Sequence, residues 1–185
     1  TPSSLASKYG DSFYSYDCGG TYKWYLTQYI ETAREVGAIP VLVTPVSRLY
    51  YTNDGSIKPH HDSTDTTTGT LVTENNAYVE AVKQLAKEQN VLLIDGFEIT
   101  KNMYEEAYKA DEKAANGKSV NGMQVMSAGD STHSNKLGGF ITAELFAQQI
   151  QNMNISLSKA VKAPSRVAGV NPDGQQVFVV DKNGT

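Results

Sequence analysis

An aspartate and a histidine stand three residues apart in the segment Asp130-Ser131-Thr132-His133, directly before a stretch with helical periodicity. This spacing allows the carboxylate of Asp130 to hold one imidazole nitrogen of His133 while the other nitrogen faces a nucleophile. The pair could therefore form the acid–base end of a hydrolytic triad. Both residues also have ordinary roles, because Asp130 can cap a turn or a helix and His133 can be a loop histidine with a satisfied hydrogen bond.

No convincing nucleophile accompanies this pair. Ser12 stands in a Gly-Asp-Ser triplet, but a nucleophilic serine of this kind follows an apolar strand, and residues 3–9 (SSLASKY) are not one. Ser131 would need an aspartate and a histidine after it, and no histidine follows His133. We therefore expect the attacking hydroxyl to lie outside this chain. The alternative is a complete enzyme that uses Ser12 in an unusual arrangement.

Three further features could bind ligands. The segment His60-His61-Asp62 could hold a metal ion only if a loop brought both imidazoles to one side, and a plain surface loop is the favoured interpretation, so we expect no metal site. Arg48 could pair bidentately with a substrate carboxylate, or be a structural arginine. Trp24 is expected to pack in the core or against a neighbouring helix rather than to serve as a platform for sugar.

Composition limits the classes of function. The chain has 185 residues, enough for one domain with a core, and no apolar run reaches the roughly 18 residues of a membrane span. Its 16 basic and 20 acidic residues form no basic footprint for nucleic acid. Eleven tyrosines suit either sugar-binding surfaces or ordinary half-buried packing. Cys18 is the only cysteine, which excludes a disulfide within the chain.

The elements that must position these residues alternate between helix and strand. Apolar side chains recur at helical spacing in four segments: residues 21–36, about 74–89, about 98–115 and from about 134 onward. Residues 39–44 and 91–95 are short apolar runs, typical of strands that are buried on both faces of a parallel sheet. This alternation predicts an α/β fold.

Some details of these elements are also predicted. The inner face of the first helix is expected to carry Tyr22, Tyr25, Leu26, Tyr29, Ile30, Ala33 and Val36, with Gly37 closing the helix. Residues 46–70 form a long polar connection, which is usually functional or disordered. Residues 120–126 could add a weak strand.

The last part of the chain, residues 161–185, differs in character. Two short apolar runs flank Asp173-Gly174, and they predict two strands around a turn. We interpret them as a linker and the start of a β-rich module, with an edge hairpin of the same domain as the alternative. Two confident strands in residues 1–160 are fewer than the about 5–6 of an average sheet, so we expect an N-terminal portion of the domain to be missing.

Three blocks, taken together and in order, resemble a known family. They are residues 20–26 (GTYKWYL), residues 40–48 (PVLVTPVSR), and Asp130-x-x-His133 with Gly138. They resemble the SGNH (GDSL-type) hydrolases, specifically the rhamnogalacturonan acetylesterase branch, over roughly residues 20–150. The Gly-Asp-Ser, Gly and Asn blocks of that family have no credible match here, so the resemblance is to the C-terminal portion only.

The resemblance implies a three-layer α/β/α (flavodoxin-like) fold, incomplete at the N-terminus, with residues 1–160 as part of the hydrolase domain. It implies that Asp130 orients the imidazole and that His133 is the general base in acyl transfer through a serine ester. The substrate would be an acetylated plant cell-wall polysaccharide, a pectin such as rhamnogalacturonan, whose acidic chain would suit Arg48.

The resemblance also implies an enzyme without metal or organic cofactor, and without nucleic acid or membrane as partners. The missing N-terminal segment of the same enzyme would be a partner, so the isolated chain is predicted to be inactive or weakly active. We expect a secreted or cell-surface location in a bacterium. The alternative from another class is a non-catalytic carbohydrate-binding or wall-associated module with a tyrosine-rich face.

Overall fold

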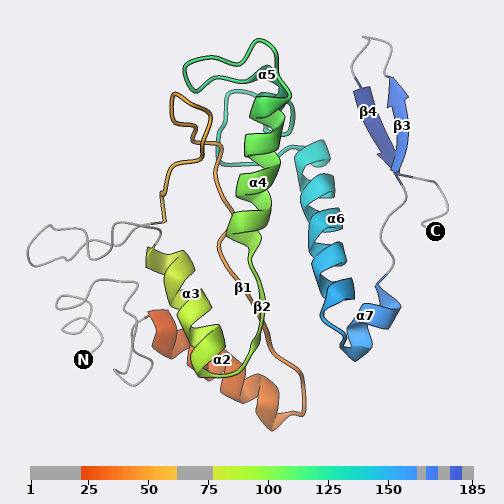
Figure 1. Cartoon of the computed structure of the whole chain (residues 1–185). Coiled ribbons are helices and arrows are strands. Elements are labelled where there is room, and N and C mark those ends of the chain that lie inside the picture. The colour runs from red at the N-terminus through yellow and green to blue at the C-terminus, as the bar shows by residue number, and fades with distance from the viewer. Residues whose placement is uncertain (1–21, 62–76, 162–165, 171–175, 181–185) are drawn as a thin grey trace, which may run out of the picture. The chain divides into compact units, whose positions relative to one another are not determined.

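The computed structural model describes residues 22–61, 77–161, 166–170 and 176–180 (Figure 1). The chain divides into two units, Thr1–Ser47 with Lys58–Glu98 and Arg48–Ile57 with Ile99–Thr185. The described part is rich in helix and contains a small parallel sheet, which is compatible with the predicted α/β class. No helix in these ranges is both long and apolar enough to cross a membrane.

The described part of the first unit contains two helices and two strands that alternate along the chain. They are α2 (Tyr22–Glu35), β1 (Val41–Val43), α3 (Ala77–Glu88) and β2 (Leu92–Ile94). The strands pair in parallel, with Val41 opposite Leu92 and Val43 opposite Ile94. The alternation of helix and strand and the parallel pairing are therefore confirmed. Gly37 follows α2 with a φ of 74°, the left-handed conformation that favours glycine at a helix end.

The core of the first unit lies between α2, α3 and the sheet (Figure 1). Its buried members are Ile30 of α2, Leu42 of β1 and Val82, Leu85 and Ala86 of α3. The α3 residues recur at spacings of three and four, which places them on one face of the helix. This confirms the helical spacing predicted for residues 74–89. Truncation of a buried leucine such as Leu85 to alanine typically costs about 2–5 kcal/mol.

The inner face predicted for α2 is partly wrong. Tyr29 and Val36 are 75% and 78% exposed, and Tyr25 is half exposed. Lys23 and Thr27 are buried instead, with Lys23 Nζ 2.8 Å from a carboxylate oxygen of Glu88. A lysine can bury its aliphatic stem when its ammonium group finds an acceptor, so this face is not visible in a pattern that counts only apolar residues.

The strands are also less buried than predicted. Leu42 and Ile94 are buried, but Val43 of β1 is 43% exposed. Successive side chains of a strand point to opposite faces, and α3 packs against both strands. Within the described residues, β1 is therefore buried on the face of Leu42 and partly exposed on the face of Val43.

Helix α4 (Gly96–Lys109) begins in the first unit and continues into the second, which also contains α5 (Val120–Gln124), α6 (Lys136–Asn152) and α7 (Ser156–Ala160). The third predicted helix is thus present, but it ends six residues before position 115. In the second unit α4 and α6 lie side by side (Figure 1), and side chains of both line a shallow hollow.

The weak strand expected at residues 120–126 is wrong, because this segment begins with α5. The side chain of Ser119 accepts a hydrogen bond from the Gly122 N–H at 3.1 Å. One carboxylate oxygen of Asp111 accepts the N–H groups of Val120 and Asn121, at 2.6 and 3.2 Å. These acceptors satisfy N–H groups that have no partner within the first turn of a helix.

The two strands predicted near the C-terminus are confirmed. They are β3 (Arg166–Val170) and β4 (Gln176–Val180), and they pair antiparallel with Arg166 opposite Val180. That this hairpin begins a separate module stays a prediction, as does the division of the chain near residue 160.

Candidate active site

The loop between α5 and α6 carries both predicted catalytic residues, and its two ends are held together. Met126 and Ser134 pair as an isolated antiparallel bridge. Inside that bridge, the Ser127 N–H donates to the carbonyl oxygen of His133 at 2.9 Å. The loop, residues 127–134, is therefore a closed turn. We call it the Asp130 loop.

The carboxylate of Asp130 organises the interior of this loop. Its Oδ1 accepts the backbone N–H groups of Thr132 and His133, at 2.6 and 3.1 Å. Its Oδ2 lies 2.6 Å from Nδ1 of the His133 ring. The hydrogen bond from the Thr132 N–H, followed by those from the ring and backbone of His133, lowers the pKa of Asp130 to about 2. Asp130 is therefore ionised at neutral pH, and the short contact places a proton on Nδ1.

The outer edge of the His133 ring is open. The side chain is 78% exposed, and within the described ranges its Nε2 makes no hydrogen bond. In a neutral imidazole with its proton on Nδ1, Nε2 carries a lone pair. The arrangement can therefore accept a proton from a group that approaches Nε2, while Asp130 fixes the ring from the other side.

Asn135 was missed in the sequence, although an asparagine directly before a helical stretch is a known start signal. Its side-chain oxygen accepts the Gly138 N–H at 3.0 Å and so caps α6. Its amide nitrogen donates to the carbonyl oxygens of Gln124 and Met126, at 2.6 and 3.0 Å. One side chain thus joins the end of α5 to the start of α6, across the base of the Asp130 loop.

Arg48 is brought to the Asp130 loop by its neighbours in sequence. The Leu49 N–H donates to the carbonyl oxygen of Ser131 at 2.8 Å. Hydrogen bonds with the side chains of Thr132 and Arg48 lower the pKa of the Tyr50 hydroxyl, and the Arg48 contact measures 3.5 Å. Tyr50 was not identified from the sequence. Its position two residues after Arg48 is a weak signal, because side chains two apart share one side of an extended segment.

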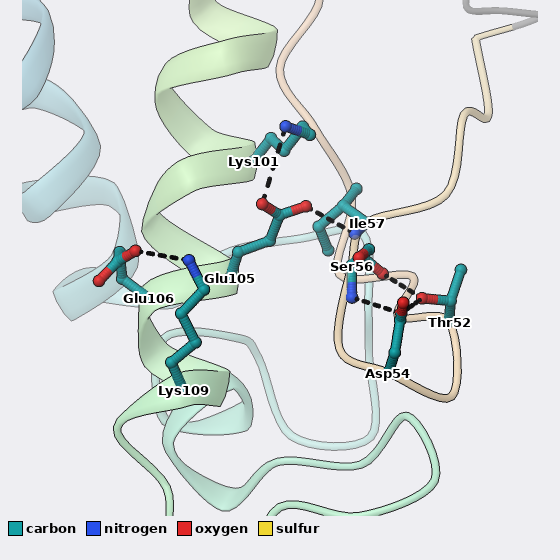
Figure 2. Close-up of polar contacts among 8 residues, drawn as sticks. All are labelled: Thr52, Asp54, Ser56, Ile57, Lys101, Glu105, Glu106 and Lys109. Atoms are coloured by element: carbon teal, nitrogen blue, oxygen red, sulfur yellow. Dashed lines mark hydrogen bonds and ion pairs between the residues drawn. The ribbon is translucent and has the colours of Figure 1, made fainter.

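A tight turn holds this segment in place, and Figure 2 shows its contacts. Asp54 accepts the Thr52 hydroxyl and, at 3.1 Å, the Ser56 N–H. Glu105 of α4 accepts the Ile57 N–H at 2.9 Å and lies 3.7 Å from the ammonium group of Lys101. The turn is thus anchored on α4. It fixes residues 48–50, which contact the Asp130 loop.

The other candidates of the sequence belong to the first unit or lie outside the described residues. The rings of His60 and His61 are tilted against each other, with centroids 4.4 Å apart, and both contact the ring of Phe97. Asp62, Ser12 and Cys18 lie outside the described residues. In the described ranges no group of three or more His, Cys, Asp or Glu side chains could hold a metal ion.

Trp24 is half-buried on α2. Its ring meets that of Tyr25 edge to face, with centroids 5.0 Å apart. Trp24 is therefore not part of the fully buried core. Sugar binding by Trp24 is the less favoured interpretation, and no contact among the described residues tests it.

A second polar group lies where β1 and β2 end, an edge at which α/β proteins commonly bind ligands. Thr44 donates to Asp95 at 3.1 Å and accepts the Phe97 N–H at 2.9 Å. Asp95 accepts the Glu98 N–H and pairs with Lys83 at 2.9 Å. These bonds cap the start of α4, which is a sufficient structural role for Thr44 and Asp95.

Two curated proteins of Bacillus subtilis (strain 168) are similar to the chain. A probable rhamnogalacturonan acetylesterase, YesY, is 36% identical over 143 residues, which cover 76% of this chain and 55% of that protein. The rhamnogalacturonan acetylesterase RhgT is 32% identical over 146 residues, which cover 74% of this chain and 54% of that protein. The resemblance to rhamnogalacturonan acetylesterase-like SGNH hydrolases is confirmed.

This chain spans about half the length of the curated relatives it matches. No protein-family model and no solved structure matches it. The three-layer arrangement of the SGNH fold and the roles of Asp130, His133 and Arg48 stay predictions.

Proposed function

We propose that the chain contributes the acid–base pair of a carbohydrate esterase that removes acetyl groups from a pectin, with rhamnogalacturonan as the substrate. Two relatives with this activity in their names support the class of reaction. The observation that carries the proposal is the 2.6 Å contact between His133 Nδ1 and Asp130 Oδ2, in a loop that leaves the rest of the imidazole exposed.

The reaction proceeds by acyl transfer. Nε2 of His133 takes the proton of a serine hydroxyl as its oxygen attacks the acetyl carbonyl, and it returns that proton to the sugar oxygen as the ester bond breaks. Water then attacks the acetyl-serine, with His133 again removing a proton and returning it to the serine oxygen. The products are acetate and the free sugar hydroxyl. Asp130 holds the ring and stabilises the imidazolium formed in each half.

The serine and the oxyanion donors come from a segment outside this chain, which is its partner in the working enzyme. One oxyanion donor is worth about 10²–10³ in rate. The chain by itself is therefore inactive or weakly active. The complete domain has the three-layer SGNH fold, and Arg48 contacts the acidic polysaccharide. Because a cell-wall polymer does not enter a cell intact, the enzyme works as a secreted or cell-surface protein.

The first test is the coding sequence upstream of Thr1, where the proposal expects a Gly-Asp-Ser triplet followed by a Gly-x-Asn-Asp block. The second is acetate release from acetylated rhamnogalacturonan, measured on the protein that the complete coding sequence specifies, which we call the full-length product. His133→Ala should lower kcat by at least about 10³-fold, because the proton acceptor is lost. His60→Ala is the matched control and should leave kcat within about twofold.

Two results would contradict the proposal. In one, His133→Ala and His60→Ala retain equal activity. In the other, the 185-residue chain alone turns over p-nitrophenyl acetate and is labelled at Ser12 by a fluorophosphonate, which would place the nucleophile within this chain.

A second candidate function rests on the exposed tyrosines of α2. Tyr25 and Tyr29 are four residues apart, share one face of the helix and are 50% and 75% exposed. Aromatic side chains with a polar tip suit the faces of sugar rings. If this surface binds pectin without catalysis, binding should survive His133→Ala and be lost in Tyr25→Ala/Tyr29→Ala.

A further inference from the structure

A hollow of about 480 Å³ lies in the second unit, within the range of about 300–1,000 Å³ that is typical of ligand sites. Its wall is largely apolar and includes Leu49, Tyr51, Val120 and Met123, and two lysines, Lys113 and Lys118, also line it. None of the described lining residues carries a carboxylate. The hollow therefore joins an apolar wall to positive charge.

Two apolar side chains of this wall are open to solvent, whereas Leu49 and Tyr51 are only 6% and 9% exposed. Val120 and Met123, both on α5, are 60% and 42% exposed. Single exposed apolar residues are common and need no explanation. Exposed apolar side chains that gather beside one hollow often mark a binding site. The buried ring of Tyr51 contributes an apolar surface to the hollow.

Both lysines are exposed, and neither ammonium group forms an ion pair with a described carboxylate. The carboxylate of Asp111, two residues before Lys113, is already occupied. It accepts bonds from Ser119 and from backbone N–H groups at the start of α5. The two cations thus remain available for an anion from outside the chain.

The hollow adjoins the proposed catalytic loop through Leu49. Leu49 lines the hollow, and its N–H donates to the carbonyl oxygen of Ser131 in the Asp130 loop. On the other side, α5 carries Val120 and Met123, and the chain continues from the end of α5 into that loop. Just after the loop, the Asn135 side chain donates to the Gln124 carbonyl oxygen. The hollow and the Asp130 loop are therefore neighbours within the second unit.

We propose that this hollow is a substrate subsite that takes a carboxylate-bearing sugar unit, a uronic acid, of the polysaccharide chain. The sugar ring packs on Val120 and Met123, and its carboxylate pairs with Lys113 and Lys118. The identity of the polymer rests on the proposed esterase function. The binding itself requires neither the serine nor turnover.

Binding can be measured on the full 185-residue chain with a galacturonic acid trimer, and with the same trimer after reduction of its carboxyl groups. The test variant is Lys113→Gln/Lys118→Gln. The control is Lys87→Gln/Lys159→Gln, which removes the same charge from exposed positions of α3 and α7. Circular dichroism verifies that both variants fold like the parent.

The charged trimer should shift the amide signals of Val120 and Met123 in NMR spectra. Its Kd should rise roughly 2- to 30-fold in the test variant, since two exposed ion pairs are lost, and stay within about twofold in the control. The reduced trimer should bind the parent as weakly as the charged trimer binds the test variant. Raising the salt concentration should weaken only the charged trimer.

The proposal is overturned if both double variants weaken binding equally, if the reduced trimer binds as tightly as the charged one, or if the shifted signals lie elsewhere. Assays of the full-length product separate this proposal from the esterase function. Unchanged trimer affinity in Lys113→Gln/Lys118→Gln, together with loss of acetate release in His133→Ala, refutes the subsite alone. Lysine-dependent binding in a protein with no esterase activity refutes the function alone.

Discussion

Two short loops of the second unit are each built around an aspartate. In the turn of residues 52–56, Asp54 accepts the Thr52 hydroxyl and the Ser56 N–H. In the Asp130 loop, Asp130 accepts the N–H groups of Thr132 and His133. The hydrogen bonds in each loop lower the pKa of its carboxyl below the usual range. As turns, the two loops use the same local chemistry.

They differ in what the carboxylate does beyond its turn. Asp54 bonds within its turn, which is tied to α4 through the Ile57 N–H and Glu105 (Figure 2). Asp130 has a second oxygen that binds an imidazole whose other nitrogen is open. A turn aspartate becomes a candidate for catalysis when it also orients a group that can exchange protons. A lowered pKa alone does not distinguish the two.

Replacing each aspartate by asparagine should give the largest difference between the two loops. In the full-length product, Asp130→Asn should lower the rate of acetate release by about 10⁴-fold, because an amide can donate to the ring and favour the wrong tautomer. Asp54→Asn should leave the rate within about twofold. Nitrogen-15 NMR of the His133 ring would show the change in tautomer. A variant Asp130→Asn that retains a tenth of the activity would contradict a catalytic role.

Each loop also contains a glycine next to its aspartate, and the two glycines should differ in tolerance. Gly55 has a φ of 89°, and a Cβ there would overlap the Tyr108 ring, whereas Gly129 has a φ of 72° with open space around it. Gly55→Ala should lower the free energy of unfolding by about 2–5 kcal/mol and Gly129→Ala by about 1–2 kcal/mol. Urea denaturation measures both. Equal losses would mean that Tyr108 moves aside freely.

A tyrosine hydroxyl contacts each of the two loops, and that of Tyr50 joins Arg48 to the Asp130 loop. Tyr50→Phe should remove that link and raise KM for the acidic polysaccharide by about 2- to 10-fold, as expected for one hydrogen bond, with little change in kcat. Tyr108→Phe removes a hydroxyl bonded to the Asn53 carbonyl near the other turn and is the control. A fall in kcat with unchanged KM would argue against a role of Arg48 in binding.

The smallest expected effect is on local stability at low pH. The pKa of Asp130 in the folded loop, about 2, lies below its usual value of about 3.9. The carboxylate therefore stabilises the loop above about pH 4, and this contribution is lost as the pH falls toward 2. Amide hydrogen exchange at Thr132 and His133, corrected for the intrinsic effect of pH, should lose protection across this window. Protection that persists at pH 2 would show that the loop does not depend on the carboxylate.

Features that depend on residues close together in sequence were mostly predicted correctly, and most features that depend on residues farther apart were not. The helical spacing of α3, the parallel strands and the Asp130–His133 contact were predicted, because each follows from local periodicity or from residues three apart. Segment 120–126 was predicted wrongly. It lacks strong helical periodicity, and the first N–H groups of its helix donate to Asp111, which lies nine residues before Val120.

The sequence by itself determined an alternating α/β pattern, a family resemblance and an aspartate placed to hold a histidine. Only the tertiary structure decided which side chains join them. Tyr50 and Arg48 reach the Asp130 loop through a bond between Leu49 and Ser131, which are 82 positions apart in the printed sequence. The hollow beside the loop likewise forms from residues 49–51 and 113–123. Such contacts arise when packing brings distant segments together, and no local pattern of residue types encodes that packing.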